Sequence, residues 1–213
     1  MTREEYIEAV KVKLEEVSPF DEPNGFIAAA GDPDYKEVKP VISYIEKTLD
    51  EAAHNCLQAL PLTLLHADIV RSEPTLTIAD DGVATFPIQP NTRFVRFRHP
   101  DLRRDITAFI TSEDPIYLLQ QNKHTRSGQS KPIAVVSSDM GQMEIYTLFP
   151  KSPTNKGVLL SIDIGKIAEN VLSPIEDYIV LECAAMVSDI LSDTVAAQTL
   201  RQELQTKVRA VLQ

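Results

Sequence analysis

The spacing of apolar positions predicts two helices before the middle of the chain. The first is expected to begin at Thr2, because Thr2 and Glu5 have the spacing of a capping box. Its apolar stripe comprises Tyr6, Ala9, Val10, Lys13, Leu14 and Val17. The second helix is expected from about residues 34–36 to Leu60, where Pro61 ends it. Its stripe comprises Ile42, Ile45, Leu49, Ala52 and Cys56.

Residues 18–38 interrupt this helical pattern. They contain three prolines and two glycines without a sustained period, which predicts a long loop. Phe20, Phe26 and Ile27 belong to it, and large apolar side chains are costly to leave in water. We therefore expect the loop to pack on its own core or on a neighbouring molecule.

From Pro74 to Asp163 the pattern changes to that of β-strands. "TLTIADDGVATFPI" predicts a hairpin around Asp-Asp-Gly. In "RFVRFRH", Phe94, Arg96 and Arg98 alternate with Arg93, Val95 and Phe97, so one face of the strand is expected to be basic. Further strands are expected at "ITAFITS", "KPIAVVSS", "QMEIYTLF" and "KGVLLSIDI", with one or two helical turns at "EDPIYLLQQN".

The helical period returns after residue 163. Ser173, Pro174 and Glu176 have the spacing of an N-cap, a first-turn proline and an N3 glutamate. Between Tyr178 and Val187 only one residue is charged, which predicts a central helix. A last helix offers one apolar face: Ala197, Leu200, Leu204, Val208 and Val211.

These elements predict an α+β fold in a single domain. About four helices from both chain ends, in residues 1–73 and 164–213, are expected to form a helical bundle. Residues 74–163 are expected to form a β-rich central insertion. The length of 213 residues, with 43% hydrophobic and 24% charged residues, suits such a globular domain.

The composition indicates a protein made in the cytoplasm. No apolar run reaches the roughly 18 residues of a membrane helix, and the first ten residues lack a signal-peptide pattern. We therefore expect no membrane partner. Cys56 and Cys183 lie in apolar helical contexts, which is typical of buried free thiols in a reducing compartment.

The charge is distributed unevenly along the chain. The net charge is −10, with −7 in residues 1–60, −3 in 61–90, +4 in 91–132 and −4 in 133–213. The basic block supplies the candidate contact residues: Arg93, Arg96, Arg98, Arg103, Arg104, Lys123, His124, Arg126 and Lys131. An acidic body with a basic insert is compatible with self-assembly, in which the basic patch of one copy meets the acidic surface of the next. A charged face that only contacts solvent remains the alternative.

Motifs for catalysis and cofactor binding are missing from the sequence. The histidines, at positions 54, 66, 99 and 124, form no pair at zinc-ligand spacing. No GxGxxG, GxxxxGK[ST] or GxSxG pattern occurs. "TRSGQSKP" contains Ser, Gly and Lys, but a strand is expected after it where a phosphate-binding loop needs a helix. The sequence therefore predicts no catalytic residue, no cofactor and no metal.

The order of these features resembles the head-to-tail adaptor proteins, also called connector or ring proteins, of tailed bacteriophages. The resemblance lies in the segments "SPFDEP", "VISYIEKTLDEAAHNCLQALPLTLL", "RFVRFRHPDLRRDITAFI", "PIYLLQQNKHTRSGQSKP" and "SPIEDYIVLECAAMVSDILSDTVAAQTLRQEL". It spans most of the chain and is nearest to the ring proteins of crAss-like podoviruses. The shared features are the order of helices and the loop-bearing β insertion.

This resemblance implies a virion structural protein without catalytic activity. It implies a dodecameric ring beneath the portal that joins capsid to tail, with other ring or tail proteins below it. Genomic DNA would pass through the channel without sequence-specific binding, and the nine candidate contact residues named above would contact neighbouring subunits or face this channel. One alternative is another oligomeric phage or cytosolic protein-interaction module without catalytic activity. A second alternative is an enzyme or a nucleic-acid-binding module whose site has no recognised motif.

Overall fold

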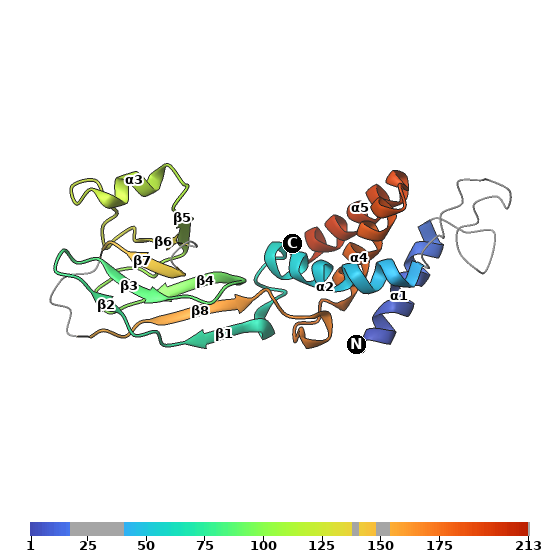
Figure 1. Cartoon of the computed structure of the whole chain (residues 1–213), viewed down its shortest axis with the longest axis horizontal. Coiled ribbons are helices and arrows are strands. Elements are labelled where there is room, and N and C mark those ends of the chain that lie inside the picture. Colours follow the sequence, from blue (N-terminus) through green and yellow to red (C-terminus); the bar gives the residue numbers. More distant parts are fainter. Residues whose placement is uncertain (18–40, 138–140, 148–153, 213) are drawn as a thin grey trace. The chain divides into compact units, whose positions relative to one another are not determined.

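The computed structural model describes residues 1–17, 41–137, 141–147 and 154–212. These residues have an α+β fold, with helices at both chain ends and two sheets in the middle, so the expected fold class is confirmed (Figure 1). The chain divides into a helical unit, Met1–Asp68 with Ile164–Gln213, and a β unit, Ile69–Asp163. The β unit begins at residue 69, ahead of the expected residue 74, because a strand follows Asp68 directly.

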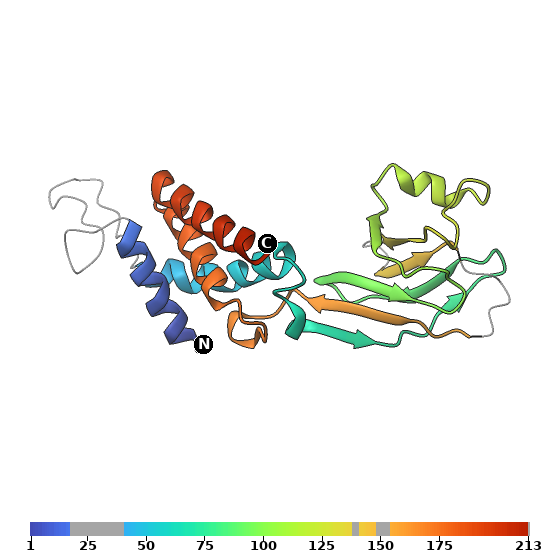
Figure 2. The ribbon, with the colours of Figure 1, turned by 180° about the vertical axis from the view of Figure 1, so that it is seen from behind.

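The helical unit is built around one central helix. Helix α4 packs against the other three long helices of the unit, and nine of its residues are buried (Figure 2). This confirms the prediction made from its nearly uncharged sequence. The four helices are α1 (Arg3–Val17), α2 (Val41–Ala59), α4 (Glu176–Ile190) and α5 (Thr194–Leu212). The expected start of the second helix lies outside the described residues.

The two predicted helix starts have different outcomes. At α1 the capping box is confirmed: the backbone N–H of Thr2 donates to Glu5 Oε2 at 2.7 Å, and the N–H of Glu5 donates to Thr2 Oγ1 at 3.3 Å. At α4 the prediction is wrong. The N-cap is Ile175, whose apolar side chain makes no cap bond, and Ser173 lies two residues before it. The backbone N–H groups of Leu172 and Ser173 donate to Asp68, and these bonds hold the segment that precedes α4 outside the helix.

The β unit contains two sheets that share one core. The first has the antiparallel order β1 (Ile69–Ser72), β8 (Val158–Asp163), β4 (Thr92–Arg98). The second has the order β2 (Thr77–Ile78), β3 (Ala84–Pro87), β7 (Gln142–Ile145), β6 (Ile133–Ser137), β5 (Ala108–Thr111). Phe86 from the second sheet stacks on Phe97 from the first, with ring centroids 5.5 Å apart. The remaining buried core side chains are Leu76, Ala84, Ile106, Ala134, Met143, Ile145 and Leu159.

Helix α3 (Ile116–Gln121) connects the parallel strands β5 and β6. This confirms the predicted helical turns and the strand after them. The basic loop of residues 122–132 follows α3, on the side of the β unit away from β1 (Figures 1 and 2). Within the described ranges, no helix combines the length and apolar character needed to cross a membrane.

Candidate functional site

A β-bulge in β4 sets which face of the strand its arginines occupy. Phe94 pairs with Ser161, but the next residue to pair is Arg96, opposite Leu160, so Val95 is the extra residue. Simple alternation places Arg93 on the face opposite Arg96 and Arg98, and the extra residue of the bulge moves it to their face. Arg93 therefore shares a face with Arg96 and Arg98, and the strand is more basic on that face than simple alternation indicates.

The register extends this basic face across the whole three-stranded sheet. Arg96 and Arg71 of β1 both pair with Leu160 of the central strand β8, so they flank it on one face. Arg93 pairs with Ile162 and Arg98 pairs with Val158 in the same way. We call this surface the arginine face: Arg71, Arg93, Arg96, Arg98, Val158, Leu160 and Ile162. Sequence analysis missed Arg71 because it lies outside the basic block, in a segment expected to be helical.

Two carboxylates partly neutralise the arginine face. Asp105 lies 3.5 Å from Arg96 Nη1 and 3.9 Å from Arg98 Nε, and Glu73 lies 2.8 Å from Arg71 Nη2. Both arginines of β4 in these pairs remain more than half exposed. Partial burial lowers the pKa of the Arg93 guanidinium, although a guanidinium remains charged at neutral pH. The face thus combines a row of positive charge with the half-buried side chains of Val158 and Leu160, a surface suited to acidic protein partners.

Arg103 and Arg104 lie in the exposed loop that follows β4. The backbone N–H of Arg103 donates to the carbonyl of Gln129 at 3.2 Å, which fixes this loop to the loop of residues 122–132. Within the described ranges neither guanidinium has a carboxylate oxygen within 4.0 Å. The structure therefore brings the two basic loops together in one unit.

The basic residues of the loop 122–132 have two different roles. Lys123, His124 and Lys131 are exposed. Arg126 is half-buried, and its guanidinium donates to the carbonyls of Tyr146 at 3.1 Å and Asp81 at 3.3 Å. Arg126 therefore holds the loop against β7 and the β2–β3 turn and is not presented to a partner.

Hydrogen bonds within the loop order it further. Asn122 Oδ1 accepts the N–H of His124 at 3.0 Å, and Thr125 Oγ1 donates to the carbonyl of Leu119 at 2.9 Å. The buried Gln120 accepts the N–H of Ser127 at 2.9 Å. These bonds fix the backbone of the loop, so the exposed side chains of Lys123 and His124 start from defined positions.

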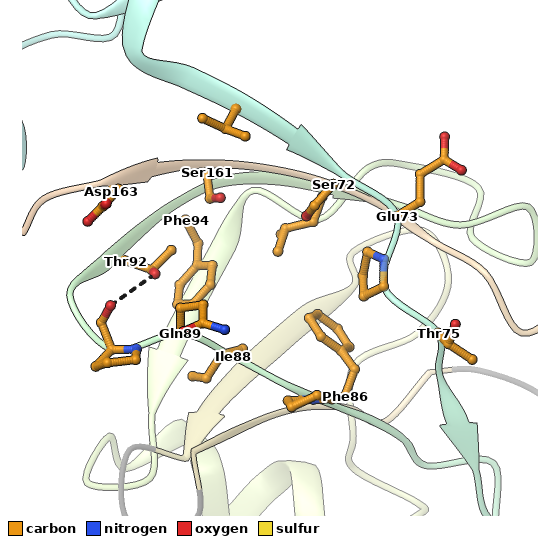
Figure 3. Close-up of a pocket in the computed structure, with 15 residues that line it drawn as sticks. Ser72, Glu73, Thr75, Phe86, Ile88, Gln89, Thr92, Phe94, Ser161 and Asp163 are labelled. Carbon is orange, nitrogen blue, oxygen red and sulfur yellow. Dashed lines mark hydrogen bonds between the residues drawn. The ribbon is translucent and has the colours of Figure 1, made fainter. Parts of the chain in front are cut away.

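The opposite face of the three-stranded sheet lines a cavity of about 730 Å³ (Figure 3). Figure 3 shows Phe94 and Ser161 on the sheet side and Phe86, Ile88 and Gln89 on the other wall. The remaining lining residues are Val70, Ser72, Glu73, Pro74, Thr75, Pro87, Pro90, Thr92, Leu159 and Asp163. We call this cavity the groove.

The groove is suited to binding an apolar group. Its lining has hydroxyl and carboxylate side chains but no His, Cys, Lys or Arg. A serine hydroxyl needs a neighbouring base to act as a nucleophile, and the lining places no imidazole beside Ser72 or Ser161. Its chemistry therefore favours recognition of an apolar side chain with hydrogen bonds at the rim.

His54 and His99 each hydrogen-bond to backbone groups of their own unit. His54 Nδ1 lies 2.8 Å from the carbonyl of Ile164. The buried His99 accepts the N–H of Asp101 at Nδ1, 3.2 Å away, and its Nε2 lies 3.3 Å from the carbonyl of Thr154. In the described ranges, no three His, Cys, Asp or Glu residues gather in a way that could hold a metal ion.

Comparison with known proteins found no matching protein family and no matching curated protein.

Proposed function

We propose that this chain is a virion structural protein of a tailed bacteriophage. It assembles with copies of itself, as a dodecamer, into a ring beneath the portal. The ring joins capsid to tail and lines the channel through which genomic DNA passes. Its partners are the portal, further ring or tail proteins and its own copies, and its place is the capsid vertex of the virion.

The arrangement of elements supports this proposal. Helices from both chain ends surround α4, and a β-rich insertion carries the loops, in the order that the resemblance to head-to-tail adaptors requires. In this proposal the insertion contacts neighbouring proteins, and the helices form the packed body of each copy.

The observation that carries the proposal is the separation of charge between the two units. The helical unit has 10 Lys and Arg against 21 Asp and Glu (−11), whereas the β unit has 11 against 10 (+1). The β unit also concentrates three arginines on one face by means of the bulge at Val95. A contact between this face and the helical unit of the next copy is heterologous, and such contacts form a ring when the rotation between copies closes.

Acidic helical units also suit a channel for DNA. Like charge disfavours adsorption of phosphate, so DNA can slide without sticking. This part of the proposal makes no use of base contacts or of a specific phosphate site.

The test is to purify the chain alone and with a portal protein encoded in the same genome, and to measure mass and particle shape. The proposal expects rings stacked on the portal in electron micrographs. A chain that stays monomeric and does not bind the portal contradicts it. Rings that form without any affinity for a portal favour the alternative, an oligomeric interaction module of another kind.

A further inference from the structure

Helix α3 buries a polar side chain and exposes apolar ones. Gln120 is the buried residue of the helix, and its Oε1 accepts the backbone N–H of Ser127 at 2.9 Å. Leu118 is 70% exposed and Leu119 is 50% exposed, on the outside of the β unit (Figures 1 and 2). Successive residues of a helix are about 100° apart, so Leu118 lies nearly opposite Gln120. Exposed apolar patches with a polar rim mark interaction sites.

A basic turn borders the two leucines. Thr125 Oγ1 donates to the carbonyl of Leu119 at 2.9 Å, which holds the turn that carries Lys123 and His124 against the end of α3. Both basic side chains are exposed. We call this surface the α3 patch: Leu118, Leu119, Lys123 and His124. An apolar centre with a basic rim favours a partner that is acidic around an apolar side chain.

Helix α1 carries a surface of that kind. Five glutamates and one valine are exposed along one side of the helix, at the spacing of a single stripe. Val12 is 47% exposed, with Glu8 one turn before it and Glu15 one turn after it. We call this surface the glutamate stripe: Glu4, Glu5, Glu8, Val12, Glu15 and Glu16.

We propose that the α3 patch of one copy binds the glutamate stripe of a second copy. Leu118 and Leu119 pack beside Val12, and Lys123 faces Glu15. The inference deepens the proposed function and rests on its self-assembly, because it names a contact between neighbouring copies. The contact is separate from the arginine face, which lies on the three-stranded sheet.

The charges of the stripe are only partly neutralised within the helix. Lys11 Nζ lies 3.2 Å from Glu8, and Lys13 Nζ lies 2.7 Å from Glu16. In the part of the chain that the structure describes, the carboxylate of Glu15 has no Lys, Arg or His nitrogen within 4.0 Å. Glu15 is therefore available to a cation of another copy.

The other long terminal helix does not offer this complementarity. The exposed residues of α5 include Arg201 and Arg209 and no carboxylate, so a basic rim gains nothing there. On the α3 side, the exposed Glu113 lies three residues before the helix and would be repelled by the stripe. The two helices are therefore expected to cross, with the end near Lys123 over the glutamates.

A second copy is the occupant because each copy carries both surfaces in different units. The α3 patch belongs to the β unit and the glutamate stripe belongs to the helical unit. Each copy then offers the patch to one neighbour and the stripe to the other. Such a contact is heterologous, and it forms a ring when the rotation between copies closes.

Cysteine cross-linking tests the contact. Leu118→Cys and Val12→Cys are co-expressed as separate variants with tags of different mass, and the purified sample is oxidised gently. The native Cys56 and Cys183 are buried, so the introduced thiols react first. We expect a heterodimer of these two variants at several-fold higher yield than one of Leu118→Cys with Val195→Cys. Val195 is the matched control because it lies on α5 and is 74% exposed.

A charge swap tests the same contact without cysteines. Glu15→Lys should reduce assembly several-fold, and Lys123→Glu in the same chain should restore it, because the two reversed charges then meet across the contact. The control adds Lys123→Glu to Glu51→Lys, a reversal at an exposed glutamate of α2 outside the stripe, and should stay several-fold below the swapped chain. Particle mass measures assembly in each case.

The mass of the cysteine samples, measured without oxidant, separates this inference from the proposed function. Assembled particles in which the heterodimer stays at the control yield overturn the inference and leave the proposed function standing. A disulfide that forms only within single chains of a Leu118→Cys, Val12→Cys double variant also overturns it, because the patch then binds its own chain. A wild-type chain that does not assemble, with or without portal, contradicts the proposed function and the inference with it.

Discussion

Lys166 Nζ lies 2.6 Å from Oδ1 of Asp68, a carboxylate with no solvent exposure, 98 residues away in sequence. The same carboxylate accepts the backbone N–H groups of Leu172 at 3.1 Å and Ser173 at 2.8 Å. Burial by itself raises the pKa of a carboxyl group, but these donors outweigh it and lower the pKa of Asp68 below the ordinary 3.8. Asp68 therefore fixes the 3-10 turn His66–Asp68 to the segment that leads into α4.

We predict that Asp68→Asn lowers the free energy of unfolding by about 3 kcal/mol, since breaking one partner of a buried ion pair is strongly destabilising. The amide removes the negative charge that faces Lys166 and turns an N–H donor toward the backbone N–H of Ser173. Urea denaturation measures the effect. Lys166→Met is the matched control and should cost less, because Asp68 keeps its two backbone bonds. An Asp68→Asn variant as stable as the wild type would contradict the role of this carboxylate.

The lowered pKa of Asp68 gives the expected pH dependence. Because the folded pKa lies below the unfolded value near 3.8, the stabilisation is fully present above that pH and is lost as the pH falls through the folded pKa. The difference in free energy of unfolding between wild type and Asp68→Asn should therefore shrink below about pH 4. Urea denaturation at a series of pH values between 3 and 7 measures it.

The helices and most strands could be predicted from sequence because each has a strong local period. Tyr6, Val10 and Leu14 are buried at the steps that the stripe predicts, and the uncharged α4 is central. The start of α4 was mispredicted because Ser173 satisfies a distant carboxylate, and no local pattern shows a tertiary bond of that kind.

The arrangement of the candidate site was less predictable. The bulge at Val95 is a register event between β4 and β8, and the sequence of β4 alone shows only alternation. Arg126 and Lys123 lie in the same polar, basic stretch of sequence. The Arg126 guanidinium nevertheless donates to the carbonyls of Tyr146 and Asp81, whereas Lys123 is exposed. Both outcomes depend on pairing across the sheet, which residues close in sequence do not determine.

We predict that the two native cysteines do not react with a thiol reagent at pH 8 in the folded protein. Burial raises the pKa of the Cys183 thiol to about 11, although Thr48 Oγ1 lies 3.4 Å from its sulfur. Burial, with a smaller contribution from Glu182, also raises the pKa of Cys56. Labelling followed by mass spectrometry should give no adduct on the native chain and two after denaturation. An adduct on the native protein would contradict the packing of α2 against α4.

The raised cysteine pKa values also predict loss of stability at alkaline pH. The folded pKa lies above the ordinary value of 9.0, so the stabilisation is present below that pH and is lost as the pH rises through the folded pKa. Tyr6, whose pKa burial raises to about 12, acts in the same direction. Thermal melts between pH 7 and 11 should show a falling midpoint above about pH 9. The fall should be smaller in Cys183→Ala.

We predict that Arg126→Met destabilises the β unit by about 2 kcal/mol, since two carbonyls lose a charged donor. Hydrogen exchange of the Ser127 amide should become faster as the loop loosens. Lys123→Ala, at an exposed position, should change stability by less than about 0.5 kcal/mol. Equal effects of the two substitutions would contradict the structural role of Arg126. Deleting residues 123–130 would remove this arginine, so point substitutions are the better probe of loop contacts.

We predict that Arg96→Glu combined with Arg104→Glu abolishes ring assembly and leaves the fold intact. Arg96 is 51% exposed, and its pair with Asp105 at 3.5 Å is of a kind that contributes about 0–1 kcal/mol. Arg104 is exposed, so the reversal removes attraction to an acidic neighbour without disturbing a core. Particle mass measures assembly and circular dichroism measures the fold.

The matched control for this reversal is Arg96→Lys with Arg104→Lys, which keeps both charges and should still assemble. Assembly of the wild type should weaken as salt rises, because exposed charges are screened over about 8 Å at physiological ionic strength. If the glutamate variant assembles as well as the lysine variant, the contact between the basic block and an acidic neighbour is wrong. The separation of charge between the helical unit and the β unit then serves solubility, since a net charge of −10 keeps separate copies apart.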